Sequence, residues 1–214
     1  MNGDLFATEP GGAETLADGV VLLRAYAAAQ APQLLADIDD IAGRAPFRHL
    51  DTPGGYRMSV AMTSCGSYGW VSDRRGYRYV RNDPQGGAPW PAMPDTWSAL
   101  ARSAAQLAGF AAFAPDVCLI NRYAPGARLA LHQDKDEADF GAPIVSVSLG
   151  LPATFVLGGL SRGDPTHRLR LSHGDVLVWG GPARLRYHAI LPLGEGMHAD
   201  AGPFRFNLTF RKAR

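Results

Sequence analysis

Cysteine is scarce in this 214-residue chain, and neither sign of charge is in excess. The two cysteines, Cys65 and Cys118, have neither the spacing of a zinc ribbon nor the number needed for a disulfide framework. We therefore expect ordinary thiols in a reducing compartment. Lys and Arg total 21 against 20 Asp and Glu, and the net charge of +1 gives no overall attraction for nucleic acid. A nucleic-acid partner would have to meet a local basic patch.

Long apolar runs are also missing. The most apolar early stretch, residues 20–29, contains Arg24 and is too short to span a bilayer. Residues 1–10 include Asp4 and Glu9 and lack the basic-then-apolar layout of a secretion signal. We therefore expect a cytoplasmic, monomeric protein with no membrane contact and no evident protein partner.

Glycine and proline, by contrast, are abundant, with 25 and 16 residues. Without a collagen-like period, this content indicates many tight turns between short strands rather than a helical bundle. Hydrophobic residues make up 46% of the chain, enough for the core of one compact domain.

Two helices and a later series of strands are predicted. Apolar side chains at helical spacing indicate helices at residues 32–43, with Pro32 in the first turn, and 95–107, capped by Asp95 and stopped by Gly109. Alternating or continuous apolar patterns predict strands at residues 117–123, 144–149, 176–179, 186–190 and 205–211.

Residues 205–211 alternate perfectly, which places Arg205, Asn207, Thr209 and Arg211 on one face. This face is either the solvated outside of a half-buried strand or the wall of a cavity that holds an anion. A guanidinium pairs well with a carboxylate, so an acidic cosubstrate such as 2-oxoglutarate would suit the second interpretation. The two arginines lie about 20 Å apart along a strand, so at least one of them is the expected anchor.

The pattern His-x-Asp occurs four times, beginning at His49, His132, His173 and His198, where chance predicts roughly half an occurrence. Two imidazoles and one carboxylate can hold iron and leave its opposite side open to oxygen. The context favours His132-Gln133-Asp134, since it follows a predicted strand and leaves enough chain to return with His188. A structural histidine remains the alternative at each site.

Aromatic and basic residues alternate in residues 62–81, which we call the lid segment. Basic groups can track phosphates while aromatic faces stack on bases, so the pattern suits a single strand or an extruded nucleotide. A solvated charged loop anchored by Trp70 is the alternative. The residues concerned are Tyr68, Trp70, Arg74, Arg75, Tyr77, Arg78, Tyr79 and Arg81.

The ordered motifs of the chain resemble the AlkB family of nucleic-acid dealkylating dioxygenases from about residue 5 to residue 211. They are residues 52–56 (TPGGY), 58–63 (MSVAMT), 121–126 (NRYAPG), 132–137 (HQDKDE), 145–150 (VSVSLG), 173–176 (HGDV), 179–181 (WGG), 187–188 (YH) and 205–211 (RFNLTFR).

The resemblance implies a mainly β fold with flanking helices (α+β), a double-stranded β-helix or jelly roll that carries an N-terminal nucleotide-recognition lid. Residues 1–214 would form one catalytic domain, with helices and lid in about residues 1–110 and the β-helix core in about residues 111–214.

The resemblance also implies a cofactor, Fe(II), and two cosubstrates, 2-oxoglutarate and O2. His132, Asp134 and His188 would bind the metal and so be catalytic, His173 would belong to a structural turn, and the triplet at His198 would lie outside the metal pattern, like that at His49. The implied 2-oxoglutarate ligands are Asn121, Tyr123, Arg205, Asn207 and Arg211.

For the substrate, the resemblance implies that Trp70 and His132 sandwich the damaged base. Met62 would line its pocket, Tyr77 would contact a phosphate, and Arg162 would lie near the lesion. Asp136 could favour a cationic methylated base and accept a hydrogen bond from its amino group. The resemblance places both Asp136 and Glu137 beside the substrate pocket, and an exposed acidic loop is the alternative, more for Glu137 than for Asp136.

The implied activity is oxidative demethylation of bases such as 1-methyladenine and 3-methylcytosine, with release of formaldehyde. The substrate would be single-stranded or base-flipped DNA, with RNA as a further candidate. One alternative is an iron- and 2-oxoglutarate-dependent hydroxylase of a protein or small molecule, which would not need the lid segment. Another is a non-enzymatic jelly-roll module that binds a metal.

Overall fold

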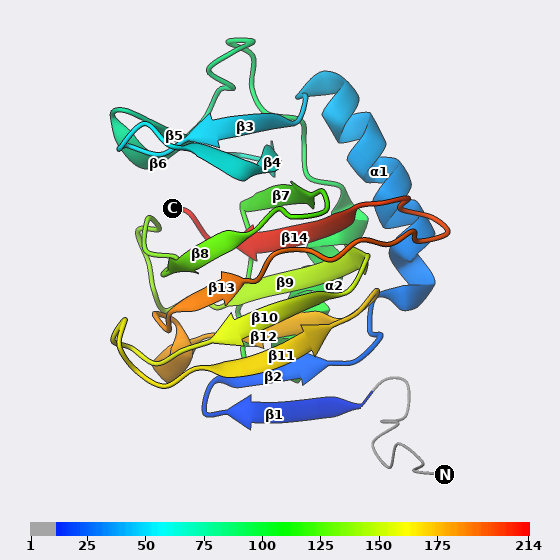
Figure 1. Cartoon of the computed structure of the whole chain (residues 1–214), viewed down its shortest axis with the longest axis vertical. Helices are drawn as coiled ribbons and strands as arrows, with labels where there is room; N and C mark the ends of the chain where they lie inside the picture. The colour runs from blue at the N-terminus through cyan, green and yellow to red at the C-terminus, as the bar shows by residue number, and fades with distance from the viewer. Residues whose placement is uncertain (1–11) are drawn as a thin grey trace.

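Two antiparallel β-sheets face each other in the computed structural model, which describes residues 12–214 (Figure 1). The sequence interpretation of residues 1–10 lies outside the described residues. In spatial order the larger sheet contains β1 (Ala13–Ala17), β2 (Val20–Leu23), β12 (Val176–Trp179), β9 (Ile144–Gly150), β14 (Arg205–Arg211), β7 (Val117–Tyr123), β4 (Arg57–Gly66) and β3 (Arg48–Asp51). The smaller sheet contains β11 (His167–Leu171), β10 (Ala153–Leu157), β13 (His188–Ile190) and β8 (Leu129–His132).

The helices lie against the larger sheet, away from the smaller one. Helix α1 (Ala31–Arg44) contacts β4, and α2 (Asp95–Leu107) contacts β9 and β12 (Figure 1). The predicted helices are therefore confirmed, although Asp95 is the first helical residue and makes no capping hydrogen bond. Two 3-10 turns, η1 (Ala28–Gln30) and η2 (Gly181–Ala183), complete the helical elements of the described chain, none of which is long and apolar enough to cross a membrane.

The predicted strands are also confirmed, with small changes at their ends. Three have the predicted bounds, the strand predicted at 144–149 extends to Gly150, and the strand predicted at 186–190 is reduced to His188–Ile190. The fold is thus the mainly β jelly roll with flanking helices that the sequence indicated.

Strand β14 lies in the middle of the larger sheet, hydrogen-bonded to β7 and β9. Its Phe206, Leu208 and Phe210 belong to the core beneath the helices. All seven of its residues are buried, so the solvated outer face considered for Arg205 and Arg211 is wrong. Because the helices already cover the Phe face, the polar residues point between the two sheets.

Most of the lid segment forms a β-hairpin of β5 (Gly69–Asp73) and β6 (Gly76–Val80), near β3 and β4 (Figure 1). Glycine is required where the hairpin begins, because a Cβ at Gly69 would lie 2.1 Å from the Trp90 ring. The hairpin is therefore packed closely against the loop that leads to α2.

The two cysteines are register partners on β4 and β7, and both are buried free thiols, as expected from their number and spacing.

Candidate metal and substrate site

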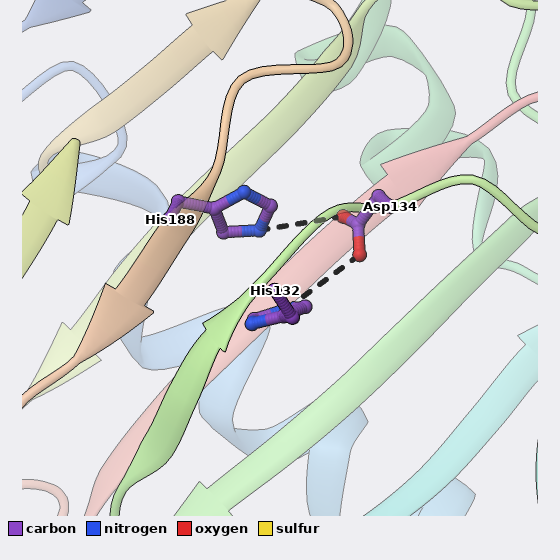
Figure 2. A group of neighbouring side chains, drawn as sticks. All are labelled: His132, Asp134 and His188. Carbon is purple, nitrogen blue, oxygen red and sulfur yellow. Dashed lines mark ion pairs between the residues drawn. The ribbon is translucent and has the colours of Figure 1, made fainter. Parts of the chain in front are cut away.

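Two histidines and one aspartate meet at the open edge of the smaller sheet (Figure 2). His132 ends β8, His188 begins β13, and the two are register partners in this antiparallel pair. Asp134 lies in the loop after β8, with its carboxylate oxygens 3.7 Å from the Nε2 atom of each histidine. The predicted combination of residues is therefore brought together by strand pairing.

The hydrogen bonds of the two imidazoles favour metal binding. His132 Nδ1 lies 2.7 Å from the carbonyl of Ala130, and His188 Nδ1 lies 3.1 Å from that of Arg186. A carbonyl can only accept, so each Nδ1 carries the proton and each Nε2 keeps a free lone pair on the side of Asp134.

Burial and local charge prepare these groups for ligation. Burial, together with the neighbouring His132, lowers the pKa of His188 to about 4, so its imidazole is neutral at pH 7. Burial alone would raise the pKa of Asp134, but the charge of Arg211, whose Nη2 donates to Oδ2 at 2.6 Å, holds that pKa well below its usual range. Neutral imidazoles and an ionised carboxylate are the forms that bind a metal.

The three groups line a cavity of about 630 Å³ between the sheets. Arg205 lines the same cavity and is 1% exposed. Its Nη2 donates to Ser148, while its Nε and Nη1 have no hydrogen-bond partner among residues 12–214. Burying unpaired donors of a charged group is costly, so an anion that accepts from them fits this wall of the cavity.

The other residues predicted to bind 2-oxoglutarate line the same cavity. The ring of Tyr123 lies 5.0 Å from the Arg205 guanidinium, and Asn121 donates to Asn207 at 3.2 Å. The Oδ1 atom of Asn121 has no partner within the described chain. Arg211 also lines the cavity, so both arginines of β14 reach it despite their separation along the strand.

The predicted base-binding residues also line the cavity. Trp70 stacks on Tyr77 with ring centroids 5.4 Å apart and donates its indole N–H to Asp136 at 2.8 Å. Arg162 donates to the carbonyl of Leu131 at 2.9 Å. The cavity is lined by Met62, Trp70, Tyr77, His132, Asp136 and Arg162.

The lid segment presents less positive charge to a ligand than its sequence suggests. Arg75 and Arg78 both pair with Asp73, and Arg81 lies over the ring of Tyr68. Of its aromatic residues only Trp70 and Tyr77 line the cavity, and Tyr79 is buried.

Glu137 differs from both of its sequence interpretations. It is 6% exposed, so it is not part of an exposed acidic loop, and it does not line the substrate cavity. It instead pairs with Arg184, a residue for which the sequence contains no signal.

Sequence reasoning also missed the aromatic setting of His188. The Phe155 ring stacks on the imidazole at 5.7 Å, and the Trp179 ring meets it edge-on at 5.2 Å. The two strands read ATFVL and VLVW, so neither alternates between polar and apolar residues, and the sequence could not show which face each ring takes.

The remaining His-x-Asp triplets are structural in their surroundings. His49 bonds to the carbonyl of Met58 on the neighbouring strand. His173 lies in the turn before β12, where its Nδ1 accepts from the backbone N–H of Gly150. His173 stacks on His198 with centroids 4.4 Å apart, and Asp200 is close by.

A jelly roll whose sheets enclose two histidines, an aspartate and a buried arginine with two donors unpartnered among the described residues defines the class of iron- and 2-oxoacid-dependent oxygenases. A model of the 2OG-Fe(II) oxygenase superfamily matches residues 19–211. The alpha-ketoglutarate-dependent dioxygenase AlkB of Escherichia coli K12 is 59% identical over 98% of this chain and 97% of its own length. The chain belongs to the AlkB family of this superfamily, and it uses Fe(II), 2-oxoglutarate and O2.

More distant relatives agree with this assignment. The solved structure of OsALKBH1 superposes with a TM-score of 0.83 at 28% identity, covering 94% of this chain and 100% of that chain. The DNA N(6)-methyladenine demethylase ALKBH1C of Arabidopsis thaliana is 38% identical over 46% of this chain and 24% of its own length.

Proposed function

We propose that this protein removes N-methyl groups from nucleic-acid bases by oxidation, with 1-methyladenine and 3-methylcytosine as substrates. The observation that carries the proposal is a single cavity lined by the histidine–aspartate group, by a buried arginine with two donors unpartnered within residues 12–214 and by two aromatic residues of the lid segment. The named activities of family members on nucleic acid support the same conclusion.

His132, Asp134 and His188 would hold Fe(II). Two neutral imidazole nitrogens and one carboxylate on the same side of the ion suit this metal and leave its other positions open. Fe(II) held by these residues would supply oxidation by O2, in which 2-oxoglutarate is converted to succinate and carbon dioxide and the N-methyl group to a hydroxymethyl group, whose carbon would then leave as formaldehyde.

Arg205 would bind the far carboxylate of 2-oxoglutarate through its unpaired Nε and Nη1 donors. Tyr123 is the register partner of Arg205 on β7, Asn121 is the register partner of Asn207, and Arg211 lies further along β14. The polar face of β14 thereby orients the cosubstrate toward the metal and gives one end of the cavity a preference for dicarboxylates.

Trp70 and His132 would enclose the methylated base at the other end. Asp136 already accepts from Trp70, yet a carboxylate has further lone pairs for the amino group of a base. Its charge would favour a base made cationic by methylation. A base inside a duplex cannot enter such a pocket, so the substrate is a single strand or a flipped nucleotide. The stacked pair Trp70–Tyr77 would then shield the reacting methyl group from water.

A defined oligonucleotide tests the proposal. We expect a DNA strand with one 1-methyladenine, incubated with Fe(II), ascorbate and 2-oxoglutarate, to lose the mass of one methylene and to release formaldehyde in equal amount. An RNA strand of the same sequence measures the preference between the two nucleic acids. Oxidation of 2-oxoglutarate with no change in the mass of either strand would contradict the proposal.

A further inference from the structure

Glu137 is a buried carboxylate three residues beyond Asp134, in the loop between β8 and β9. Neither metal nor substrate binding explains its position, because Glu137 does not line the cavity. A buried carboxylate is costly unless its charge is paired and its oxygens are hydrogen-bonded. Its contacts therefore indicate what it does.

Two hydrogen bonds and one longer ion pair, from three distant parts of the chain, hold Glu137. Its Oε2 accepts from Arg184 Nη2 at 2.9 Å, and its Oε1 accepts from the Tyr79 hydroxyl at 2.6 Å. Its Oε1 also lies 3.6 Å from Nε of Arg211. Tyr79 belongs to β6 of the lid segment, Arg184 follows η2, and Arg211 ends β14.

Both of these arginines also hold Asp134. Arg184 Nη1 donates to the Asp134 carbonyl at 2.7 Å, and Arg211 Nη2 donates to the Asp134 carboxylate at 2.6 Å. Arg184 thus bridges Glu137 and the Asp134 backbone by hydrogen bonds. Arg211 hydrogen-bonds the Asp134 carboxylate and lies within ion-pair distance of Glu137, although its Nε has no hydrogen-bond partner in the described chain. Because the guanidinium is planar and rigid, fixing one edge of it fixes the direction in which the other edge points.

We propose that Glu137 is a positioning residue that sets the orientation of Asp134 for metal binding by holding Arg184 and Arg211 in place. Tyr79 joins the same arrangement, because its hydroxyl donates to Glu137 and accepts from Arg211 Nη1 at 3.2 Å. The metal-binding loop is thereby tied to the lid segment by one buried hydrogen bond.

The test compares two variants that each neutralise a buried carboxylate. Glu137→Gln keeps the size of the side chain and removes its charge. Asp83→Asn is the matched control, since Asp83 pairs with Arg48 and neither residue lines the cavity. The measurement is the Kd for Mn(II), titrated in the absence of O2 and followed by the electron paramagnetic resonance of the free ion, beside the thermal midpoint of the metal-free protein.

We expect Glu137→Gln to bind Mn(II) about 10-fold more weakly than wild type, the lower end of the effect found when direct partners of metal ligands are changed, because Glu137 acts on Asp134 through two arginines. Asp83→Asn should lose thermal stability without losing Mn(II) affinity. A Kd for Glu137→Gln within twofold of wild type, or an equal loss of affinity in both variants, would overturn the proposal.

Tyr79→Phe provides a second, milder variant in case Glu137→Gln does not fold. Removing one hydroxyl should weaken Mn(II) binding by less than Glu137→Gln does. The double variant should lose less affinity than the sum of the two single losses, since the two changes share the Tyr79–Glu137 hydrogen bond. Additive losses, or Tyr79→Phe with the affinity of wild type, would count against the proposal.

The Mn(II) titration contains no nucleic acid. A failure of the wild-type protein to demethylate an oligonucleotide would therefore end the proposed function and leave the inference about Glu137 untouched.

Discussion

Two groups of two histidines and one aspartate lie in the described part of this molecule, and only one of them is built to hold a metal. In the first group both Nδ1 atoms face backbone carbonyls, which leaves both Nε2 atoms free on the side of Asp134. In the second group the Nδ1 atoms of His173 and His198 accept from the backbone N–H groups of Gly150 and Asp200. The protons of these neutral rings therefore lie on Nε2, where a metal would need a lone pair.

The surroundings of the two groups also favour metal binding in the first group and not in the second. The first group lines the large cavity and is supported by Arg211. In the second, the rings stack with planes only 19° apart, Asp200 is mostly exposed, and none of the three lines that cavity. The hydrogen-bond partner of Nδ1 and access to a cavity, rather than residue types and spacing, therefore distinguish a metal-binding histidine from a structural one.

Removing the carboxylate from each group gives the largest expected contrast. Asp134→Ala should abolish demethylation and weaken Mn(II) binding by more than the roughly 100-fold that outer partners contribute. Asp200→Ala should leave the turnover rate and the Mn(II) Kd unchanged. Equal effects of the two substitutions would erase the distinction between the groups.

Removing the proposed 2-oxoglutarate anchor beside the first group should have the next largest effect. Arg205→Ala removes charged hydrogen bonds worth about 1.5–3 kcal/mol each, so we expect the KM for 2-oxoglutarate to rise by about tenfold or more. Arg168→Ala, an exposed arginine on β11, is the control. The measurement is succinate formation at varied 2-oxoglutarate, and an unchanged KM in Arg205→Ala would move the anchor elsewhere.

Trp70→Ala should affect the nucleic acid and spare the cosubstrate. Stacking on an aromatic ring contributes about 1–3 kcal/mol per base, so the KM for a methylated oligonucleotide should rise roughly tenfold while that for 2-oxoglutarate stays the same. Tyr68→Ala serves as a control from the lid segment, since Tyr68 does not line the cavity. Parallel changes in both constants would indicate a collapsed site rather than a lost stacking surface.

The smallest expected effect is on the pH dependence of the free energy of unfolding, through His173 of the second group. Burial and the neighbouring His198 lower the pKa of His173, so the unfolded chain binds a proton more readily than the folded protein does. His173 therefore contributes its full stability above the unfolded pKa of about 6.5 and loses it as the pH falls below that value. The free energy of unfolding of the metal-free protein should decline less steeply in acid for His173→Gln than for wild type. Identical slopes in urea titrations would contradict this.

Most of the strand and helix framework was predictable, because residues such as Phe206, Leu208 and Phe210 repeat at the period of a strand. Periodicity could not decide whether the polar face of β14 is solvated, since that depends on the smaller sheet that faces it across the cavity. The choice of His132 over the other triplets rested on the order of motifs, whereas the tautomers that justify it depend on the local conformation that turns each Nδ1 toward the carbonyl two residues before it.

Glu137 illustrates what a sequence alone leaves out. Its neighbours in sequence suggest an acidic surface loop, but its partners are Tyr79, Arg184 and Arg211, which are distant in sequence and carry no shared motif. Only the closed jelly roll brings them together.

Anomalous scattering from a crystal grown with Mn(II) and 2-oxoglutarate tests the distinction between the two groups most directly. We expect one strong peak among His132, Asp134 and His188, with a 2-oxoglutarate carboxylate on Arg205 and no peak between His173 and His198. A peak at the second group, or none at the first, would contradict it.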